Sequence, residues 1–120
     1  MSSTLYERLG GGVGITQLVD DMMAAYLRNP IIRTRFEAIK DLERAKQITV
    51  EFFCANSGGP QEYTGLDMVS RHRGMNISEQ EFIAGVDDIL ASMDKNKFGE
   101  AEKRDVLAFV YSMKDKIIRR

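Results

Sequence analysis

The chain has 120 residues, and its 17 Lys and Arg against 18 Asp and Glu give a formal net charge of -1. This balance disfavours nucleic acid and anionic membranes as partners, because both attract basic surfaces. The single cysteine, Cys54, excludes an intramolecular disulfide, and no window reaches the ~20 apolar residues that a membrane span needs. The N-terminus also lacks the basic-then-apolar pattern of a secretory signal. We therefore expect a cytoplasmic protein, with residues 1–120 in a single domain.

The first predicted helix is short, because Thr4 and Glu7 have the spacing of a capping box just before three consecutive glycines. We interpret the glycine run as a flexible hinge, since it lacks the preceding strand and the Gly-Lys-Ser/Thr ending of a phosphate-binding loop. From Gly14 to Asn29 apolar residues recur three and four positions apart, which predicts a helix with one buried face. The Asn29-Pro30 pair ends this helix.

The middle of the chain is predicted to alternate short helices and loops. A short helical turn covers residues 31–36, and Asp41 then caps a helix that ends at Ser57-Gly58-Gly59-Pro60. Residues 61–77 form a loop around one short helix from Asp67 to Arg73. His72 lies at the end of that helix.

Two longer helices complete the prediction. Ser78 and Glu81 form a second capping box, which opens a helix that ends at the break from Asn96 to Gly99. A last helix starts near Glu100 and presents apolar residues as far as Ile117. No segment alternates as a strand, so the sequence predicts one all-α domain.

His72 is the only histidine, which excludes two-histidine metal sites and the HExxH motif. Cys54 lies within a helix among apolar residues, so we interpret it as a buried structural thiol and not as a nucleophile. Arg71 and Arg73 flank His72 and disfavour the imidazolium form, which leaves the neutral ring that coordinates metals. From these residues alone, an exposed histidine in a basic loop is the favoured interpretation.

Several stretches in order resemble the first group of truncated haemoglobins, across nearly the whole chain. The matching stretches are Leu5-Tyr6-Glu7-Arg8-Leu9-Gly10-Gly11, Phe36, Glu51-Phe52-Phe53, Gly58-Gly59-Pro60, Tyr63-Thr64-Gly65, Met68, His72-Arg73-Gly74, Ile77-Ser78 and Phe82. The resemblance implies a two-over-two helical sandwich that holds haem b, iron protoporphyrin IX, with His72 as the proximal iron ligand. Haem needs an apolar slot and one neutral nitrogen ligand, and this chain has both.

The resemblance also implies which side chains contact the haem. Apolar contacts are expected from Phe36, Phe52, Phe53, Met68, Ile77, Phe82, Leu107 and Val110. Without the resemblance, any of these would be interpreted as core. Tyr63, Arg71 and Arg73 are expected to meet the haem propionates.

The distal side of the expected pocket departs from the family, which commonly places a Tyr and a Gln there. Met23 occupies the position of the Tyr, and Tyr26, three residues on, is a poor geometric substitute. Counting back from Phe52 puts Thr49 at the Gln position and Ala45 one turn earlier. Gln47 then faces away, unless an extra residue lies inside this helix instead of in the loop before it. An apolar distal pocket predicts weak oxygen retention.

The leading hypothesis is reversible binding of a diatomic gas, which is oxygen, nitric oxide or carbon monoxide, at haem iron. A nitric-oxide dioxygenase is an alternative, and it requires a separate reductase because no reductase segment is visible in this sequence. Electron transfer is a third reading, with a Met thioether as the iron ligand opposite His72. A haem-free helical interaction module is the fourth.

Overall fold

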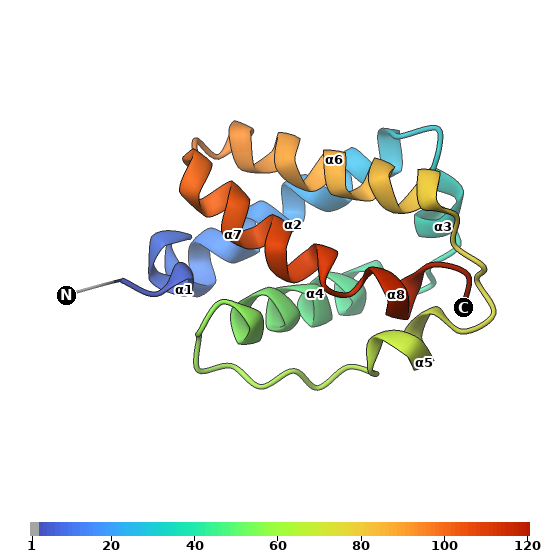
Figure 1. Ribbon diagram of the computed structural model, residues 1–120, viewed down its shortest axis with the longest axis horizontal. Coiled ribbons are helices and arrows are strands. Elements are labelled where there is room, and N and C mark those ends of the chain that lie inside the picture. Colours follow the sequence, from blue (N-terminus) through green and yellow to red (C-terminus); the bar gives the residue numbers. More distant parts are fainter. Residues whose placement is uncertain (1–2) are drawn as a thin grey trace.

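The computed structural model describes residues 3–120, which form helices joined by turns and one long loop (Figure 1). Helix α1 (Leu5–Arg8) begins with the predicted capping box. The Thr4 hydroxyl accepts a hydrogen bond from the Glu7 amide at 3.1 Å, and the Glu7 carboxylate accepts one from the Thr4 amide at 3.2 Å. Helices α2 (Gly11–Arg28) and α3 (Arg33–Glu37) follow, and α2 ends before Asn29-Pro30 as predicted.

Side-chain caps fix where three of the remaining helices start. The remaining helices are α4 (Leu42–Asn56), α5 (Met68–His72), α6 (Glu79–Lys95), α7 (Glu100–Tyr111) and α8 (Lys114–Ile117). Asp41 caps α4 by accepting from the Arg44 amide, and Asp67 caps α5 by accepting from the Ser70 amide. The predicted capping box at Ser78 is present at the start of α6.

The prediction of a flexible hinge at the glycine run is wrong, because α2 begins within it. Gly10 precedes α2 with φ 90°, in the left-handed region that favours glycine. A Cβ atom on Gly14 would lie only 2.0 Å from the carbonyl oxygen of Leu9. The glycines therefore allow the end of α1 to pack directly on the first turn of α2.

The last predicted helix is also interrupted, since α7 ends at Tyr111 and α8 begins at Lys114. At the break the Ser112 hydroxyl donates to the carbonyl of Phe109 at 2.6 Å, and Met113 donates its amide to Val110, three residues back. Such side-chain bonds compete with the helical pattern. The interruption allows α8 to turn toward α5.

The long helices form two layers, as the two-over-two prediction requires. Helix α2 packs on α4 and on α6, and α7 lies beside α6 (Figure 1). The main core between them is fully buried around Ile15, Leu18, Met22 and Val106. A second apolar cluster, which contains Ile77, Phe82 and Val86, lies near α8.

Within residues 3–120, β structure is limited to one parallel bridge between Ile77 and Ile118. The all-α prediction is therefore confirmed for the part of the chain that the structure describes. None of the helices in that part combines the length and the apolar character needed to cross a membrane.

Candidate functional site

Two adjoining cavities lie between the helical layers, with volumes of about 500 Å³ and 480 Å³. The first lies between α3, α6 and the residues that follow α5, and the second lies between α2, α4 and α5. Residues that line both cavities are Tyr26, Phe36, Ile39, Arg71, His72, Ile89, Val110 and Ile117. These shared walls place His72 where the cavities meet. The combined space is large enough for a cofactor, since ligand sites usually measure ≈ 300–1,000 Å³.

The imidazole of His72 is held in one tautomer. Its Nδ1 atom lies 2.8 Å from the carbonyl oxygen of Met68, one turn back along α5. A carbonyl can only accept, so Nδ1 carries the proton and Nε2 keeps a lone pair for a metal. Burial lowers the pKa of His72 and the Arg71 charge lowers it further, against the opposing effect of the Met68 bond. The ring is therefore neutral at neutral pH.

The protein supplies His72 as an isolated ligand. In the described part of the chain, His, Cys, Asp and Glu do not gather in groups of three or more that would hold a metal ion. A metal at His72 would therefore need further ligands from a cofactor, as iron has in a porphyrin.

Most residues that the sequence predicted at a haem site line these cavities. They are Phe36, Phe52, Phe53, Tyr63, Met68, Arg71, His72, Ile77, Phe82 and Val110. Leu107 lines neither cavity, because it packs against the cluster of Ile77, Phe82 and Val86. Arg73 is exposed and also lies outside both linings.

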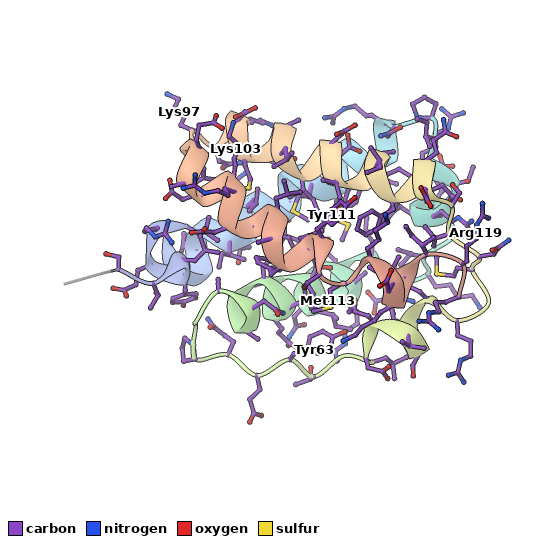
Figure 2. All side chains as sticks on the ribbon, in the orientation of Figure 1. Tyr63, Lys97, Lys103, Tyr111, Met113 and Arg119 are labelled. Atoms are coloured by element: carbon purple, nitrogen blue, oxygen red, sulfur yellow. The ribbon has the colours of Figure 1, made fainter. Side chains whose placement is uncertain are left out.

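Tyr63 lies on the long loop beside α4 (Figure 2). Its ring meets that of Phe52 edge-on, with the ring centroids 5.7 Å apart. Its hydroxyl donates to the carbonyl of Leu66. That bond commits the phenolic proton, so the structure gives Tyr63 an aromatic contact with the cavity but no free donor for a propionate.

The predicted distal residues Met23, Ala45 and Thr49 all line the second cavity. Gln47 lies elsewhere, in a polar pocket between α2 and α4 with a volume of about 580 Å³. The Thr49 hydroxyl donates to the carbonyl of Ala45 at 2.8 Å. These three distal side chains therefore offer no uncommitted hydrogen-bond donor.

Helix geometry alone makes Tyr26 a poor substitute for a distal Tyr, but the structure places it on both cavities. It is only 7% exposed, and its ring stacks on that of Phe36 with the centroids 4.5 Å apart. Burial raises the pKa of Tyr26, and the nearby Asp88 charge raises it further. Its hydroxyl forms no hydrogen bond with the residues described. The three-residue step from Met23 was a signal for this placement, because residues at that spacing are neighbours on a helix.

Cations that the sequence patterns did not single out also lie at the two cavities. Lys40 lines the first cavity and Arg44 the second, and neither forms an ion pair within residues 3–120. Arg35 forms two hydrogen bonds with the Glu81 carboxylate, at 2.7 Å and 3.1 Å. The density of basic residues from 33 to 44 was visible, but which of them reach a cavity depends on how α3 packs.

A chain of two helical layers with one neutral histidine between apolar cavities has the defining features of the globin class. The family model for bacterial-like globins matches residues 4–119. The chain therefore belongs to the bacterial-like globin family, as a truncated haemoglobin.

Relatives and solved structures agree with this assignment. Group 1 truncated haemoglobin GlbN of Nostoc sp. (strain MUN 8820) is 26% identical over 118 residues, which are 98% of this chain and 99% of that protein. GlbN of Mycolicibacterium paratuberculosis is 31% identical over 80 residues, which are 67% of this chain and 58% of that protein. The truncated haemoglobin of Tetrahymena pyriformis in its Fe(III) form has the same fold, with a TM-score of 0.93 at 21% identity over 98% of this chain and 100% of that one. The predicted family and fold are thus confirmed.

Proposed function

We propose that this chain binds haem b in the two adjoining cavities and reversibly binds a diatomic gas there. The observation that carries this proposal is the geometry of His72. Its Nδ1 proton is committed to Met68, and its Nε2 lone pair is available in a neutral, half-buried ring where the cavities meet. When bound, haem would be held by His72 and would supply an iron that can bind oxygen, nitric oxide or carbon monoxide.

The surrounding residues fit such a group. Aromatic and aliphatic side chains cover both cavities, which suits the porphyrin faces and limits access of water. Lys40, Arg44 and Arg71 carry positive charges at the lining and suit the carboxylates of the propionates. The distal side leaves space for a gas, because we expect no iron ligand from Met23, Ala45 or Thr49.

The absorption spectrum of the protein tests the proposal directly. We expect the chain reconstituted with haem to give a ferrous spectrum that changes reversibly when carbon monoxide or oxygen is added. His72→Ala should lose stable haem binding, and added imidazole should restore it, because no other histidine replaces the ligand. Arg104→Ala is the control, since Arg104 is exposed on α7 and lines neither cavity. An unchanged five-coordinate ferrous spectrum in His72→Ala would show that the assignment of the proximal ligand is wrong.

We also propose that residues 1–120 act as one domain in a reducing, cytoplasmic setting. The radius of gyration is 13.7 Å, and a compact domain of this length is expected to have about 13.6 Å. The lone Cys54 is fully buried, and burial raises the pKa of its thiol. A thiol of this kind is unreactive and suits a protein that needs no disulfide.

A further inference from the structure

The helix that carries His72 is short and depends on a contact with α8. Helix α5 has five residues and α8 has four, and helices of this length are not stable by themselves. Among the described helices, α8 is the one on which α5 mainly packs. Figure 1 shows α8 and the C-terminal residues beside α5 and the segment that leads to α6.

Backbone hydrogen bonds join the C-terminal residues to the segment that follows α5. The Arg119 amide donates to the carbonyl of Ile77 at 2.9 Å, and the Asn76 amide donates to the carbonyl of Arg120 at 2.8 Å. Between them lies the parallel bridge of Ile77 with Ile118. We call residues 76–77 and 118–120 together the C-terminal clasp. Arg119 lies at the end of the molecule where this segment passes (Figure 2).

Side chains anchor the clasp on both sides. Ile118 packs against the cluster that contains Ile77, Phe82 and Val86. Ile117, just before the clasp, lines both cavities together with His72. The Arg120 guanidinium donates through Nε to the carbonyl of Asp115 at 2.9 Å, which ties the last residue back to α8.

The clasp is close to His72 along the chain. The carbonyl of His72 accepts a hydrogen bond from the Met75 amide at 3.1 Å, and Asn76 follows directly. We propose that residues 118–120 are positioning residues for His72, because the clasp fixes the backbone that sets where the imidazole lies in the cavity. Loosening the clasp would weaken the bond between the histidine and iron. The effect on the bond to iron rests on the proposed haem binding, whereas the hold of the clasp on α5 does not.

The backbone angle at position 119 provides a matched pair of variants. Arg119 has φ 59°, which glycine adopts readily and proline cannot. Arg119→Pro also removes the amide that donates to Ile77. Ile118 is already extended, with φ -71° and ψ 130°, so a following proline does not clash with it. Arg119→Gly loses the same side chain, and with it the same 3.4 Å hydrogen bond from the guanidinium to Asn76 Oδ1, but it keeps the amide and the angle.

The first test measures amide hydrogen exchange in the haem-free protein. We expect Arg119→Pro to speed exchange about tenfold in residues 68–77 while residues 42–56 of α4 stay unchanged, and Arg119→Gly to change neither. Unchanged exchange in residues 68–77, or an equal increase in both segments, would overturn the proposal. If Arg119→Pro does not fold, Ile118→Ala is judged by the same comparison, because it keeps the backbone bonds and removes only packing.

The second test measures the iron–histidine stretching band of the ferrous, haem-loaded protein. We expect this band to move to lower wavenumber in Arg119→Pro and to stay in place in Arg119→Gly. An unmoved band in Arg119→Pro would overturn the positioning role. Failure of the unaltered protein to bind haem would instead overturn the proposed function, and the exchange measurement would still decide whether the clasp holds α5.

Discussion

If the chain binds haem as proposed, the side chain at position 23 should determine how firmly oxygen is held. Met23 provides no hydrogen-bond donor, and the Thr49 hydroxyl donates to Ala45. A hydrogen bond to a charged acceptor contributes roughly 1.5–3 kcal/mol, and ~1.4 kcal/mol corresponds to a factor of ten. We therefore expect fast oxygen dissociation, which Met23→Tyr slows by about ten- to a hundredfold. Stopped-flow mixing of the oxygen-loaded protein with carbon monoxide measures this rate.

Thr49→Val is the control for that prediction. It removes a hydroxyl whose proton is already committed, so it should leave the dissociation rate unchanged. Slow dissociation in the unaltered protein, together with no effect of Thr49→Val, would contradict the prediction of an apolar distal site. Faster dissociation in Tyr26→Phe would then identify the phenol of Tyr26 as the missing donor.

The thioether of Met23 also bears on the ligand opposite His72. Met23 is 4% exposed and packs in the core around α2, which is a usual role for this flexible side chain. Thioether ligation would require α2 to approach the iron more closely than a pocket for a diatomic gas requires. We expect an open or water-occupied sixth position, and so a ferrous spectrum that Met23→Leu leaves unchanged. A low-spin ferrous spectrum that becomes high-spin in Met23→Leu would favour electron transfer instead.

At the residue level, the sequence was informative where one side chain has one chemical role. His72 was predicted as the iron ligand because no other histidine competes with it. Leu107 lies outside both cavity linings, because an apolar residue on α7 suits the core and a cavity equally well, and only the packing of α6 on α7 separates the two positions. Tyr26 was not predicted to line the site, because its angular position around the helix does not show whether its long side chain reaches the cavity.

The helices themselves were predictable wherever a polar side chain caps a helix end. Thr4, Asp41, Asp67 and Ser78 each accept a backbone amide in the first turn of a helix, and each was visible in the sequence. The start of α2 was not predictable, because its glycines allow close packing of α1 on α2. This is a tertiary contact, which the pattern within a single helix does not show. The break between α7 and α8 was hidden for the same reason, since α8 turns to meet α5.

The ion pair between Arg35 and Glu81 links α3 to the start of α6. Hydrogen bonding to Arg35 lowers the pKa of Glu81, so the pair stabilises the fold above the usual pKa of a glutamate and loses its effect as the pH falls. We expect Glu81→Gln to lower the free energy of unfolding by about 1 kcal/mol at pH 7, because both side chains are partly exposed. The difference should shrink below about pH 4. Urea unfolding of the haem-free protein at several pH values measures it.

Glutamine at position 81 isolates the effect of the charge. A capping box accepts Glu or Gln at this position, so the start of α6 is preserved. Glu37→Gln is the control, because Glu37 is exposed and forms no ion pair within residues 3–120. Equal losses in both variants, or a difference that stays constant as the pH falls, would contradict the prediction.

The site as a whole was beyond local sequence patterns. Its shared walls come from α2, α3, α5, α6, α7 and α8, so no single helix carries a recognisable pocket. Periodicity predicts that Ile89 and Ile117 lie on the apolar faces of their helices, but it does not show that they face a cavity next to His72. The order of motifs along the chain predicted the fold that brings these helices together, but it did not single out Ile89 or Ile117 as residues of the site.

Haem binding should stabilise the whole molecule, because a ligand that binds only the folded chain shifts the unfolding equilibrium. At a free haem concentration of about 1,000 times Kd the gain is about 4.1 kcal/mol, which corresponds to a rise in Tm of roughly 10–20 °C. Iron-free protoporphyrin IX is the matched probe, since it fills the same apolar space without a bond to His72. In the unaltered chain, we expect haem to raise the Tm more than protoporphyrin does. In His72→Ala, we expect the two compounds to change the Tm by the same amount. Scanning calorimetry measures both values, and equal shifts in the unaltered chain would show that His72 adds nothing to haem binding.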